Sequence, residues 1–423
     1  MARKMRDSGV EWIGEVPEGW EVNLIGTFYS QRSEKVSDRD YAPLSVTMKG
    51  VLPQLATVAK TDDGDNRKLV KKGDFAINSR SDRRGSCGIS EYDGSVSLIN
   101  TILMPRGEMD PRYYNWLFHT EAFADEFYKW GHGIVDDLWT TRWSEMKRIQ
   151  IVAPPLPEQR AIADYLDGKC AAIDVAVDEL KRGIEDCKAW KKVIITEATS
   201  FGLDDDVKLL QTELGWISNR PSYWKRNQLS SLCRRGITYG IVKLGEPCEN
   251  GVKVLRCSDV KDGYLDASNV RTVTPELSDE YKRTVLSGGE VIVNVRGTLG
   301  GCAIVPKEFS GANIAREVAL LDVEESKANP KFIMYTLLSS CFANYVGHEM
   351  AGAIYQGLNI ATLSKYSFYA PDIKEQQAIA DYLDEKCAAI DALVAEKEKL
   401  IADLEAYKKS LIFELVTGKR EVA

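Results

Sequence analysis

AIADYLDGKCAAID, at residues Ala161–Asp174, returns as AIADYLDEKCAAID at residues Ala378–Asp391. The two stretches differ only at Gly168 and Glu385, and a Glu-Gln pair precedes both of them. A repeat of this length, separated by 217 residues, is typical of an internally duplicated chain. We therefore expect two copies of one unit, each a globular block followed by a long helix.

Apolar side chains recur every three or four residues from each repeat onward, which predicts a coiled-coil seam on each helix. The seam residues are Ile162, Leu166, Cys170, Ile173, Val177, Leu180, Ile184 and Cys187 in the first helix, and Ile379, Leu383, Cys387, Ile390, Val394, Ile401, Leu404, Leu411 and Leu415 in the second. Gly183 is expected to weaken the first helix, and Lys397 interrupts the second seam. A lone helix about 60 Å long needs a partner, and the simplest partner is the other copy packed antiparallel.

This pairing predicts two blocks at opposite ends of a rod, related by pseudo-two-fold symmetry. The predicted fold class is α+β, with two tandem α/β domains separated by two long helices that form an antiparallel coiled coil. The expected boundaries are 1–156 for the first block, 157–202 for the central helix, 203–372 for the second block and 373–423 for the C-terminal helix.

Both blocks open with the same apolar pattern, WI-x-x-x-P-x-x-W. It runs from Trp12 to Trp20 in the first block and from Trp216 to Trp224 in the second. We interpret the pattern as an apolar plug that seats the entrance of each block, in preference to tryptophans that stack on bases.

A framework of strands and helices follows in each block. KKGDFAINSR (Lys71–Arg80) and SGGEVIVNVR (Ser287–Arg296) both predict a glycine-acid turn, a short strand and then Asn-x-Arg where the strand ends. Asp110–Pro111 and Asn329–Pro330 predict helix starts, because proline suits the first turn of a helix. Each block therefore reads as a mixed α/β domain.

Composition restricts the class of protein. The net charge is −8, but residues 1–156 hold 21 basic and 23 acidic residues and residues 203–372 hold 19 and 20. A near-neutral block can still present a basic face to a nucleic acid. No apolar run is long enough for a membrane span, and the start, MARKMRDSGVEW, lacks the apolar core of a signal peptide. We therefore expect a cytoplasmic protein without a membrane partner.

Catalytic and metal-binding signals are missing from the sequence. It contains neither GxGxxG at a helix start nor GxxxxGK[ST], and no Asn-Pro-Pro-aromatic run of the kind expected in amino-methylating enzymes. No Ser–His or Cys–His pair recurs in both copies. Nine cysteines without a CxxC pair, and only three histidines, favour buried free thiols over zinc ligands or disulfides. We expect no catalysis, no metal and no cofactor in this chain.

Clustered basic and polar side chains remain in matching loops of two otherwise diverged blocks. Arginine, asparagine and glutamine can read guanine and adenine edges, and basic side chains around them can neutralise phosphates. The DNA-binding candidates are Arg80, Arg83, Arg84 and Arg142 in the first block, and Arg235, Tyr239, Arg296, Thr298, Arg316, Tyr355, Gln356 and Asn359 in the second. The alternative for each residue is a solvated surface side chain.

The chain resembles the specificity subunits of type I restriction-modification systems. The residues that carry the resemblance are the repeated PPLPEQRAIADYLDGKCAAID and PDIKEQQAIADYLDEKCAAID, the closing LVTGKREV, and VLRCSDVKDGYLD with GGEVIVNVRGTLG in the second block. The first block has SRSDRRGSCG where the second has VRGTLGGCA, so loop contacts carried over to Arg83 and Arg84 are less secure than those at Arg296 and Thr298.

The resemblance implies that each block is a target recognition domain for one half of a split site in double-stranded DNA. It also implies that the paired helices are a spacer that binds two modification (methyltransferase) subunits. S-adenosylmethionine would belong to those subunits, whereas ATP and Mg would belong to restriction subunits with motor and nuclease activity. The modification subunits would flip and methylate an adenine in each half-site.

Polar residues that recur in the two repeats are candidates for binding the methyltransferase subunits. They are Asp164, Asp167 and Lys169 with Asp381, Asp384 and Lys386. Three other functions stay open from the sequence: a specificity protein for a fused nuclease-methyltransferase, a coiled-coil adaptor whose blocks bind protein, and a stand-alone enzyme.

Overall fold

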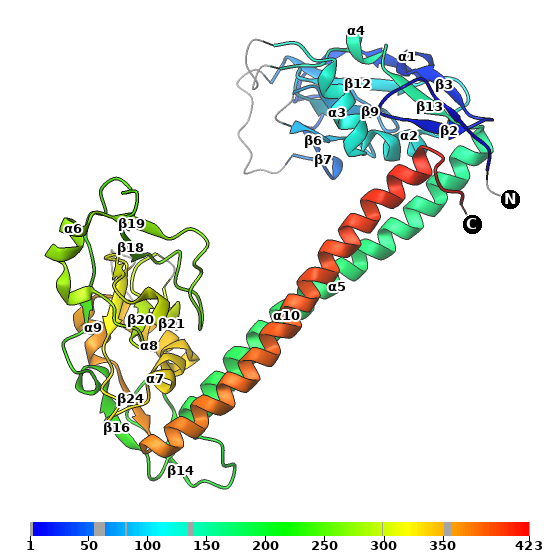
Figure 1. The fold of residues 1–423 in the computed structure, drawn as a ribbon. Coiled ribbons are helices and arrows are strands. Elements are labelled where there is room, and N and C mark those ends of the chain that lie inside the picture. Colours follow the sequence, from blue (N-terminus) through cyan, green and yellow to red (C-terminus); the bar gives the residue numbers. More distant parts are fainter. Residues whose placement is uncertain are drawn as a thin grey trace. The chain divides into compact units, whose positions relative to one another are not determined.

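The computed structural model describes residues 3–54, 64–80, 83–133, 139–297, 299–350 and 357–422. The chain forms two compact units (Figure 1). Unit 1 contains Met1–Leu180 and Lys399–Ala423, and unit 2 contains Lys181–Glu398. Each unit holds one globular block and one half of each long helix, α5 (Leu156–Phe201) and α10 (Ile373–Val416).

In each unit, a lysine–aspartate ion pair joins the two helix halves. Lys408 Nζ lies 2.6 Å from an Asp174 oxygen in unit 1, and Lys191 Nζ lies 2.7 Å from an Asp391 oxygen in unit 2. These residues occupy equivalent positions of the repeat. Most of the predicted seam side chains are buried in the unit to which they belong, which confirms the seam.

Gly183 and Lys397, the two irregular seam positions, face each other in unit 2. A Cβ added at Gly183 would lie 3.3 Å from the Lys397 Nζ, so the glycine leaves room for the lysine side chain. Farther along α5, Lys191 pairs with Asp391, which precedes Lys397 on α10. Residue numbers therefore rise along one helix as they fall along the other, and the predicted antiparallel pairing is confirmed.

The block of unit 1 is built on a four-stranded antiparallel sheet with the order β10-β9-β12-β4. A three-stranded sheet has the order β11-β8-β5, and three strand pairs, β1-β2, β6-β7 and β13-β3, complete the block. The strands are β1 (Met5–Asp7), β2 (Glu15–Pro17), β3 (Glu21–Leu24), β4 (Tyr29–Arg32), β5 (Lys35–Val36), β6 (Leu44–Thr47), β7 (Gly50–Pro53), β8 (Arg67–Val70), β9 (Phe75–Asn78), β10 (Cys87–Ile89), β11 (Gly94–Val96), β12 (Asn100–Pro105) and β13 (Gln150–Ala153).

The block of unit 2 repeats this architecture. Its four-stranded sheet has the order β17-β23-β20-β21, its three-stranded sheet has the order β19-β18-β22, and β14-β15 and β16-β24 are pairs. The strands are β14 (Leu209–Gln211), β15 (Asn219–Pro221), β16 (Lys225–Gln228), β17 (Thr238–Tyr239), β18 (Val252–Leu255), β19 (Arg271–Val273), β20 (Val291–Asn294), β21 (Cys302–Ile304), β22 (Asn313–Ile314), β23 (Val318–Leu321) and β24 (Ser367–Ala370). The duplication seen in the helices therefore extends through the blocks.

Short helices pack beside these sheets in both units. They are α1 (Ile25–Phe28), α2 (Pro111–Phe118), α3 (Glu121–Lys129) and α4 (Trp143–Met146) in unit 1, and α6 (Pro275–Glu280), α7 (Pro330–Leu338), α8 (Ser340–Met350) and α9 (Ile360–Lys365) in unit 2. The predicted helix starts are confirmed, because the Asp110 and Asn329 side chains accept hydrogen bonds from the backbone N–H groups of Arg112 and Phe332.

The WI-x-x-x-P-x-x-W pattern lies in the core of each block. Trp20 is 1% exposed and Trp224 is 2% exposed, and Ile13 and Ile217 are buried with them. Buried indole rings cannot stack on bases, so Trp20 and Trp224 agree with the interpretation as an apolar plug, whereas Trp12 and Trp216 are half-buried against the same cores.

Each long helix ends on a glycine that lies against a tryptophan of this plug. Gly202 follows α5 with φ +85° and contacts Trp224, and Gly418 follows α10 with φ +73° and contacts Trp20. Glycine is favoured at such ends because this backbone conformation costs other residues free energy. In the described part of the chain, no helix is both long and apolar enough to cross a membrane.

Candidate nucleic-acid interface and block–helix junction

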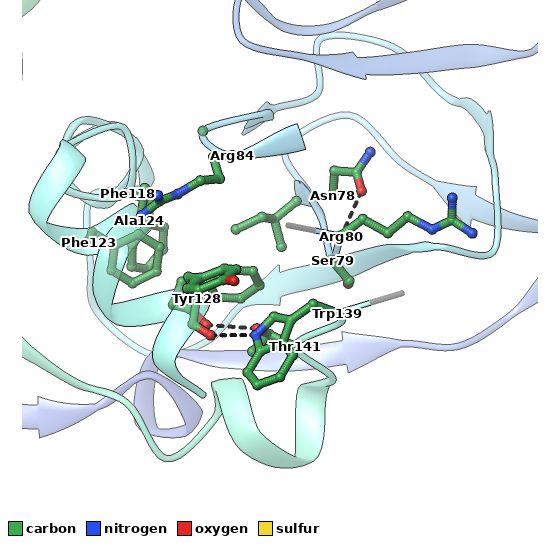
Figure 2. A pocket seen from close by; sticks show the side chains of 13 residues that line it. Asn78, Ser79, Arg80, Arg84, Phe118, Phe123, Ala124, Tyr128, Trp139 and Thr141 are labelled. Atoms are coloured by element: carbon green, nitrogen blue, oxygen red, sulfur yellow. Dashed lines mark hydrogen bonds between the residues drawn. The ribbon is translucent and has the colours of Figure 1, made fainter. Parts of the chain in front are cut away.

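In unit 1, the loop after β9 pairs with the loop that leads to α4. The Arg80 N–H donates to Asn78 Oδ1 at 3.1 Å, and Arg80 forms a β-bridge with Thr140. The Thr141 N–H donates to the Ser79 carbonyl at 3.0 Å. Figure 2 shows the Arg80 side chain extending away from the aromatic rings of this region. We call this pair of connected segments the strand-end loop.

Unit 2 contains the same strand-end loop after β20. Arg296 forms a β-bridge with Gly357, and the Leu358 N–H donates to the Val295 carbonyl at 2.8 Å. Arg296 is exposed, whereas its counterpart Arg80 is half-buried. The fold therefore places the two predicted arginines at equivalent positions.

A second pair of candidates occupies equivalent helix N-caps. Arg142 precedes α4 and Asn359 precedes α9, each two residues after the residue that bridges to the strand-end arginine. Both are exposed. Asn359 Oδ1 accepts a hydrogen bond from the Thr362 N–H at 2.7 Å, whereas the Arg142 side chain makes no capping bond. The two copies thus present different chemistry from one backbone position.

Arg84 has a partner inside its own block. It forms an ion pair with Asp125 of α3, and its guanidinium lies 5.2 Å from the ring centroid of Tyr128. Tyr128 in turn packs against Trp139, with centroids 5.6 Å apart (Figure 2). Arg83 is exposed and its N–H donates to the Arg80 carbonyl at 3.3 Å. Arg84 therefore contributes to the packing of the loop against α3.

The remaining candidates of unit 2 lie on other loops. Arg235 forms an ion pair with Asp322 at 3.2 Å and donates to the Arg283 carbonyl at 3.0 Å. Tyr239 is 48% exposed and Arg316 is exposed. Thr298, Tyr355 and Gln356 lie outside the described residues.

The sequence analysis missed two basic residues beside Arg235. Lys282 and Arg283 form a short exposed turn after α6, and the Arg283 carbonyl accepts a hydrogen bond from Arg235. The only sequence signal was their adjacency. The turn adds two cations to the group that contains Arg234 and Arg235.

Cys87 and His119 form the nearest approach to a nucleophile–base pair in the described residues. The Cys87 Sγ lies 3.8 Å from both ring nitrogens of His119. Burial raises the pKa of the Cys87 thiol and lowers the pKa of His119, so both groups are held neutral. A nucleophilic cysteine needs a thiolate, and this environment opposes one. Among the described residues, no group of three potential ligands could hold a metal ion.

The junction between each block and its long helix uses the repeated Glu-Gln pair. Gln159 Oε1 accepts from the Asp110 N–H at 2.9 Å, and its Nε2 donates to the Pro154 carbonyl at 2.8 Å. Gln376 makes the same bonds with Asn329 and Pro371, both at 2.9 Å. Each buried glutamine therefore joins the start of a block helix to the start of a long helix.

The glutamates of the pair bind the plug tryptophans. Trp20 Nε1 donates to Glu158 at 2.9 Å, and Trp224 Nε1 donates to Glu375 at 3.2 Å. Arg3 also forms an ion pair with Glu158. The repeated residues just before AIADYLD are thus structural.

The predicted partner-binding residues fall into two groups. Asp164 and Asp167 bond to Arg112, and Asp384 bonds to Lys331, so these carboxylates contact their own block. The other three candidates differ: Asp381 accepts from Gln377 of its own helix at 2.7 Å, Lys386 lies 5.6 Å from the Tyr382 ring centroid, and Lys169 is exposed. Binding of these residues to a methyltransferase stays a prediction.

A groove recurs beside the C-terminal half of each long helix. In unit 1 it measures about 730 Å³ and lies between α3 and α10, with Lys409 and Ile412 among its lining residues. In unit 2 it measures about 780 Å³ and lies between α8 and α5, with Lys192 and Ile195 at the same repeat positions. The duplication therefore produces two similar concave surfaces, one in each unit.

The chain is similar to known proteins. Residues 221–403 match the family described as the type I restriction modification DNA specificity domain. The EcoBI specificity subunit of a type I restriction enzyme from Escherichia coli is 24% identical over 272 residues, and the MjaVIII specificity subunit from Methanocaldococcus jannaschii is 25% identical over 426 residues. The chain is therefore similar to specificity subunits of type I restriction-modification systems.

The extent of the similarity to specificity subunits differs between relatives. The EcoBI alignment covers 63% of this chain and 57% of that subunit, so the chain matches little more than half of that relative. The MjaVIII alignment covers 96% of this chain and 94% of that subunit. The family match contains all the second-block candidates, from Arg235 to Asn359, and ends before the C-terminal half of α10 is complete.

Two solved structures are similar to this chain over nearly its whole length. A chain from a structure that describes complex assembly and conformational transition of a type I R-M system has a TM-score of 0.71 at 14% identity, with 96% of this chain and 99% of that chain covered. The HsdS subunit from Thermoanaerobacter tengcongensis has a TM-score of 0.52 at 15% identity, with 96% and 98% covered. The chain therefore shares the fold of these two proteins.

Proposed function

We propose that this chain is the non-catalytic DNA sequence-specificity subunit of a type I restriction-modification complex. In this proposal each block is a target recognition domain that reads one half of a bipartite target in double-stranded DNA. The observation that carries the proposal is the duplicated strand-end loop, in which one backbone arrangement presents Arg80 and Arg142 in unit 1 but Arg296 and Asn359 in unit 2. The same backbone arrangement with different side chains would allow the two blocks to recognise two different half-site sequences.

The side chains at these positions have the chemistry of base readout. Arg296 and Arg80 can donate two hydrogen bonds to the O6 and N7 atoms of guanine, and the amide of Asn359 can pair with adenine. Lys282 and Arg283, which lie beside Arg235, would neutralise phosphates. Phosphate contacts would position each block, and the strand-end loop would supply the sequence preference.

The paired helices would fix the gap between the half-sites and bind two methyltransferase subunits. Two similar grooves and two copies of the AIADYLD surface support this stoichiometry. The methyltransferase subunits would carry S-adenosylmethionine and perform the chemistry. Restriction subunits, with ATP and Mg, would join the same complex.

Mapping methylated adenines in the genome, with and without this gene, tests the proposal directly. We expect one split motif with a methylated adenine in each half, which disappears when the gene is deleted. An unchanged methylation map would contradict the proposal. The map also returns the half-site sequences and the gap between them.

Replacing Arg296 with alanine tests whether the blocks read independently. We expect binding of the second block to its half-site to fall by about tenfold to a hundredfold, which corresponds to about 1–3 kcal/mol for a lost bidentate base contact. Arg226→Ala is the matched control, because Arg226 is exposed on β16 and pairs with Glu213 of the same block. Equal loss of discrimination at both half-sites, with both variants folded, would contradict independent reading.

Charge reversal of the AIADYLD surface tests partner binding. We expect Asp164→Lys combined with Asp381→Lys to weaken assembly with the methyltransferase, while circular dichroism of the free chain shows unchanged helicity. Normal assembly of this variant would contradict a role of these carboxylates in binding the methyltransferase. Their positions favour the test, because Asp164 has a side chain that is 67% exposed and Asp381 bonds within its own helix.

Binding and activity assays separate the proposal from an adaptor or a stand-alone enzyme. DNA binding by the methyltransferase complex should weaken steeply with salt, because phosphate contacts release counterions. An adaptor whose blocks bind protein would give no such DNA binding. The purified chain with labelled S-adenosylmethionine and no partner should transfer no methyl group, and turnover would contradict a non-catalytic subunit.

A further inference from the structure

Besides the apolar packing of the core, hydrogen bonds and ion pairs join the block and the long helix of each unit at two separate levels. The buried glutamines, Gln159 and Gln376, form the first level at the start of the long helix. The last aspartate of AIADYLD, Asp167 or Asp384, forms a second level two helical turns farther along. The two levels are about 12 Å apart along the helix axis.

In unit 1, helix α2 supplies two donors to the second level. Trp116 Nε1 donates to Asp167 Oδ1 at 2.8 Å, and Arg112 Nη1 donates to Asp167 Oδ2 at 3.1 Å. Arg112 and Trp116 are four residues apart on α2, so they project from the same face. Both carboxylate oxygens of Asp167 are therefore used by the block.

In unit 2, helix α7 supplies donors of the same kind from the same positions. Tyr335 Oη donates to Asp384 Oδ1 at 2.8 Å, and Lys331 Nζ forms an ion pair with Asp384 Oδ2. Lysine replaces arginine and tyrosine replaces tryptophan, yet a cation at the second helix position and an aromatic donor at the sixth recur. The aspartate is identical in both copies while its partners differ only in detail.

The exposure of the second level argues against a main role in stability. The side chain of Asp167 is 43% exposed and that of Asp384 is 35% exposed. Ion pairs at such exposure contribute little to folding, whereas the buried glutamine and tryptophan contacts already hold the block to the helix. Two contacts that are separated along the helix can fix the angle between the block and the long helix, whereas a single contact cannot.

We propose that Asp167 and Asp384 are positioning residues that set the orientation of each block on its own long helix, and thereby the gap between half-sites that the complex accepts. This inference rests on the proposed function. It assigns the last aspartate of each AIADYLD repeat to the block rather than to the methyltransferase surface. Asp381, whose bond stays within α10, keeps its place among the partner-binding candidates.

A lever estimate shows that the effect is large enough to measure. When a water molecule replaces a direct hydrogen bond, the two groups can move apart by about 2 Å. Because the two levels are about 12 Å apart, this displacement tilts the block by roughly 10° relative to the helix. At about 20 Å from the helix, near the far side of a domain of this size, the tilt becomes a shift of about 3 Å. That is on the order of one base-pair step.

The experiment measures gap preference in the assembled methyltransferase complex. The substrates are duplexes that carry the mapped half-sites at the native gap and at gaps one base pair longer or shorter. We expect Asp384→Ala to reduce the ratio of native-gap to altered-gap methylation by about fivefold, the scale of a single exposed charged contact. Asp384→Asn should retain part of the ratio, because its amide oxygen still accepts from Tyr335. Asp167→Ala should act in the same direction.

Glu385→Ala is the matched control, because it removes an exposed carboxylate of the same repeat for which the first copy has Gly168. An unchanged ratio in Asp384→Ala, or an equal change in Glu385→Ala, would overturn the inference. Equal loss of methylation at every gap, with failed assembly, would also overturn it by assigning Asp384 to partner binding.

A second measurement reads the orientation without DNA or partners. Spin labels at the exposed positions Glu276 of block 2 and Glu398 of α10 report the distance between block and helix in the free chain. The labels need a chemistry that does not use thiols, because the chain has nine cysteines. We expect a broader distance distribution in Asp384→Ala than in Glu385→Ala, and identical distributions would contradict the inference. If the wild-type complex had no gap preference, the proposed function would fail while this measurement still tested the orientation.

Discussion

The junction and the strand-end loop are both duplicated, but they are duplicated in different ways. At the junction the side chains themselves recur, and Gln159 and Gln376 make the same pair of hydrogen bonds. At the strand-end loop only the backbone pairing recurs, with Arg142 in one copy where Asn359 stands in the other. Residues that hold the fold are therefore fixed by their partners, and residues on the loop are free to differ.

The largest test of this comparison removes a plug tryptophan. Trp20→Ala should lower the free energy of unfolding by about 3–5 kcal/mol, because it leaves a large cavity in the core. Urea unfolding followed by circular dichroism measures the change. Trp190→Ala is the control, since Trp190 is 57% exposed on α5, and a similar loss there would contradict a specific role for the plug.

The buried glutamines should give the next largest effect. Gln376→Ala leaves the Asn329 N–H and the Pro371 carbonyl without their partner, which should cost about 2 kcal/mol. Gln377→Ala removes a neighbouring exposed amide and should cost much less in the same unfolding experiment. If the two variants unfolded alike, the junction would not depend on its buried amide.

The cross-helix ion pairs should give small and equal effects in the two units. Asp174→Ala and Asp391→Ala each remove one exposed lysine–aspartate pair, and each should cost about 0.5 kcal/mol or less. The cost should shrink in high salt, because ions screen exposed charges. Unequal losses would show that the duplicated helices are not energetically equivalent.

The strand-end loop should give the smallest effect on stability. Arg142→Ala should leave the free energy of unfolding within about 0.5 kcal/mol of the wild-type value, because the exposed Arg142 side chain makes no capping bond. Recognition of the first half-site should nevertheless fall while the second is unaffected. A stability loss as large as that of Gln376→Ala would abolish the distinction between loop and junction.

Features encoded by neighbouring residues could be predicted from the sequence. The seams of α5 and α10 follow from apolar spacing, and the starts of α2 and α7 follow from Asp-Pro and Asn-Pro. The strand before each Asn-x-Arg follows from its apolar residues between a glycine turn and a polar end. In each case the deciding interactions lie within a few residues of one another.

Features that depend on distant residues could not be predicted. The sequence showed that Glu158 recurs as Glu375, but the partner of Glu158 is Trp20, 138 residues away. The ion pair of Arg84 with Asp125 of α3 could not be predicted either, and DNA binding by Arg84 stays a prediction. Nothing in the local sequence indicates that the fold brings α3 to this loop. Base contacts at Arg80 and Arg296 stay predictions.

Unit 1 is assembled from two segments that lie far apart in the sequence, and this has a consequence for synthesis on the ribosome. Tyr113 Oη donates to the Val416 carbonyl, and Lys419 Nζ donates to the Ile13 carbonyl, so residues near the end of the chain complete the block at its beginning. Unit 2, in contrast, is one continuous segment, Lys181–Glu398. At translation rates of about 5–20 residues per second, the nascent first block waits about 10–40 s for its last helix. The block made first is therefore the last to be completed, because Leu411 and Leu415 of α10 belong to its apolar core.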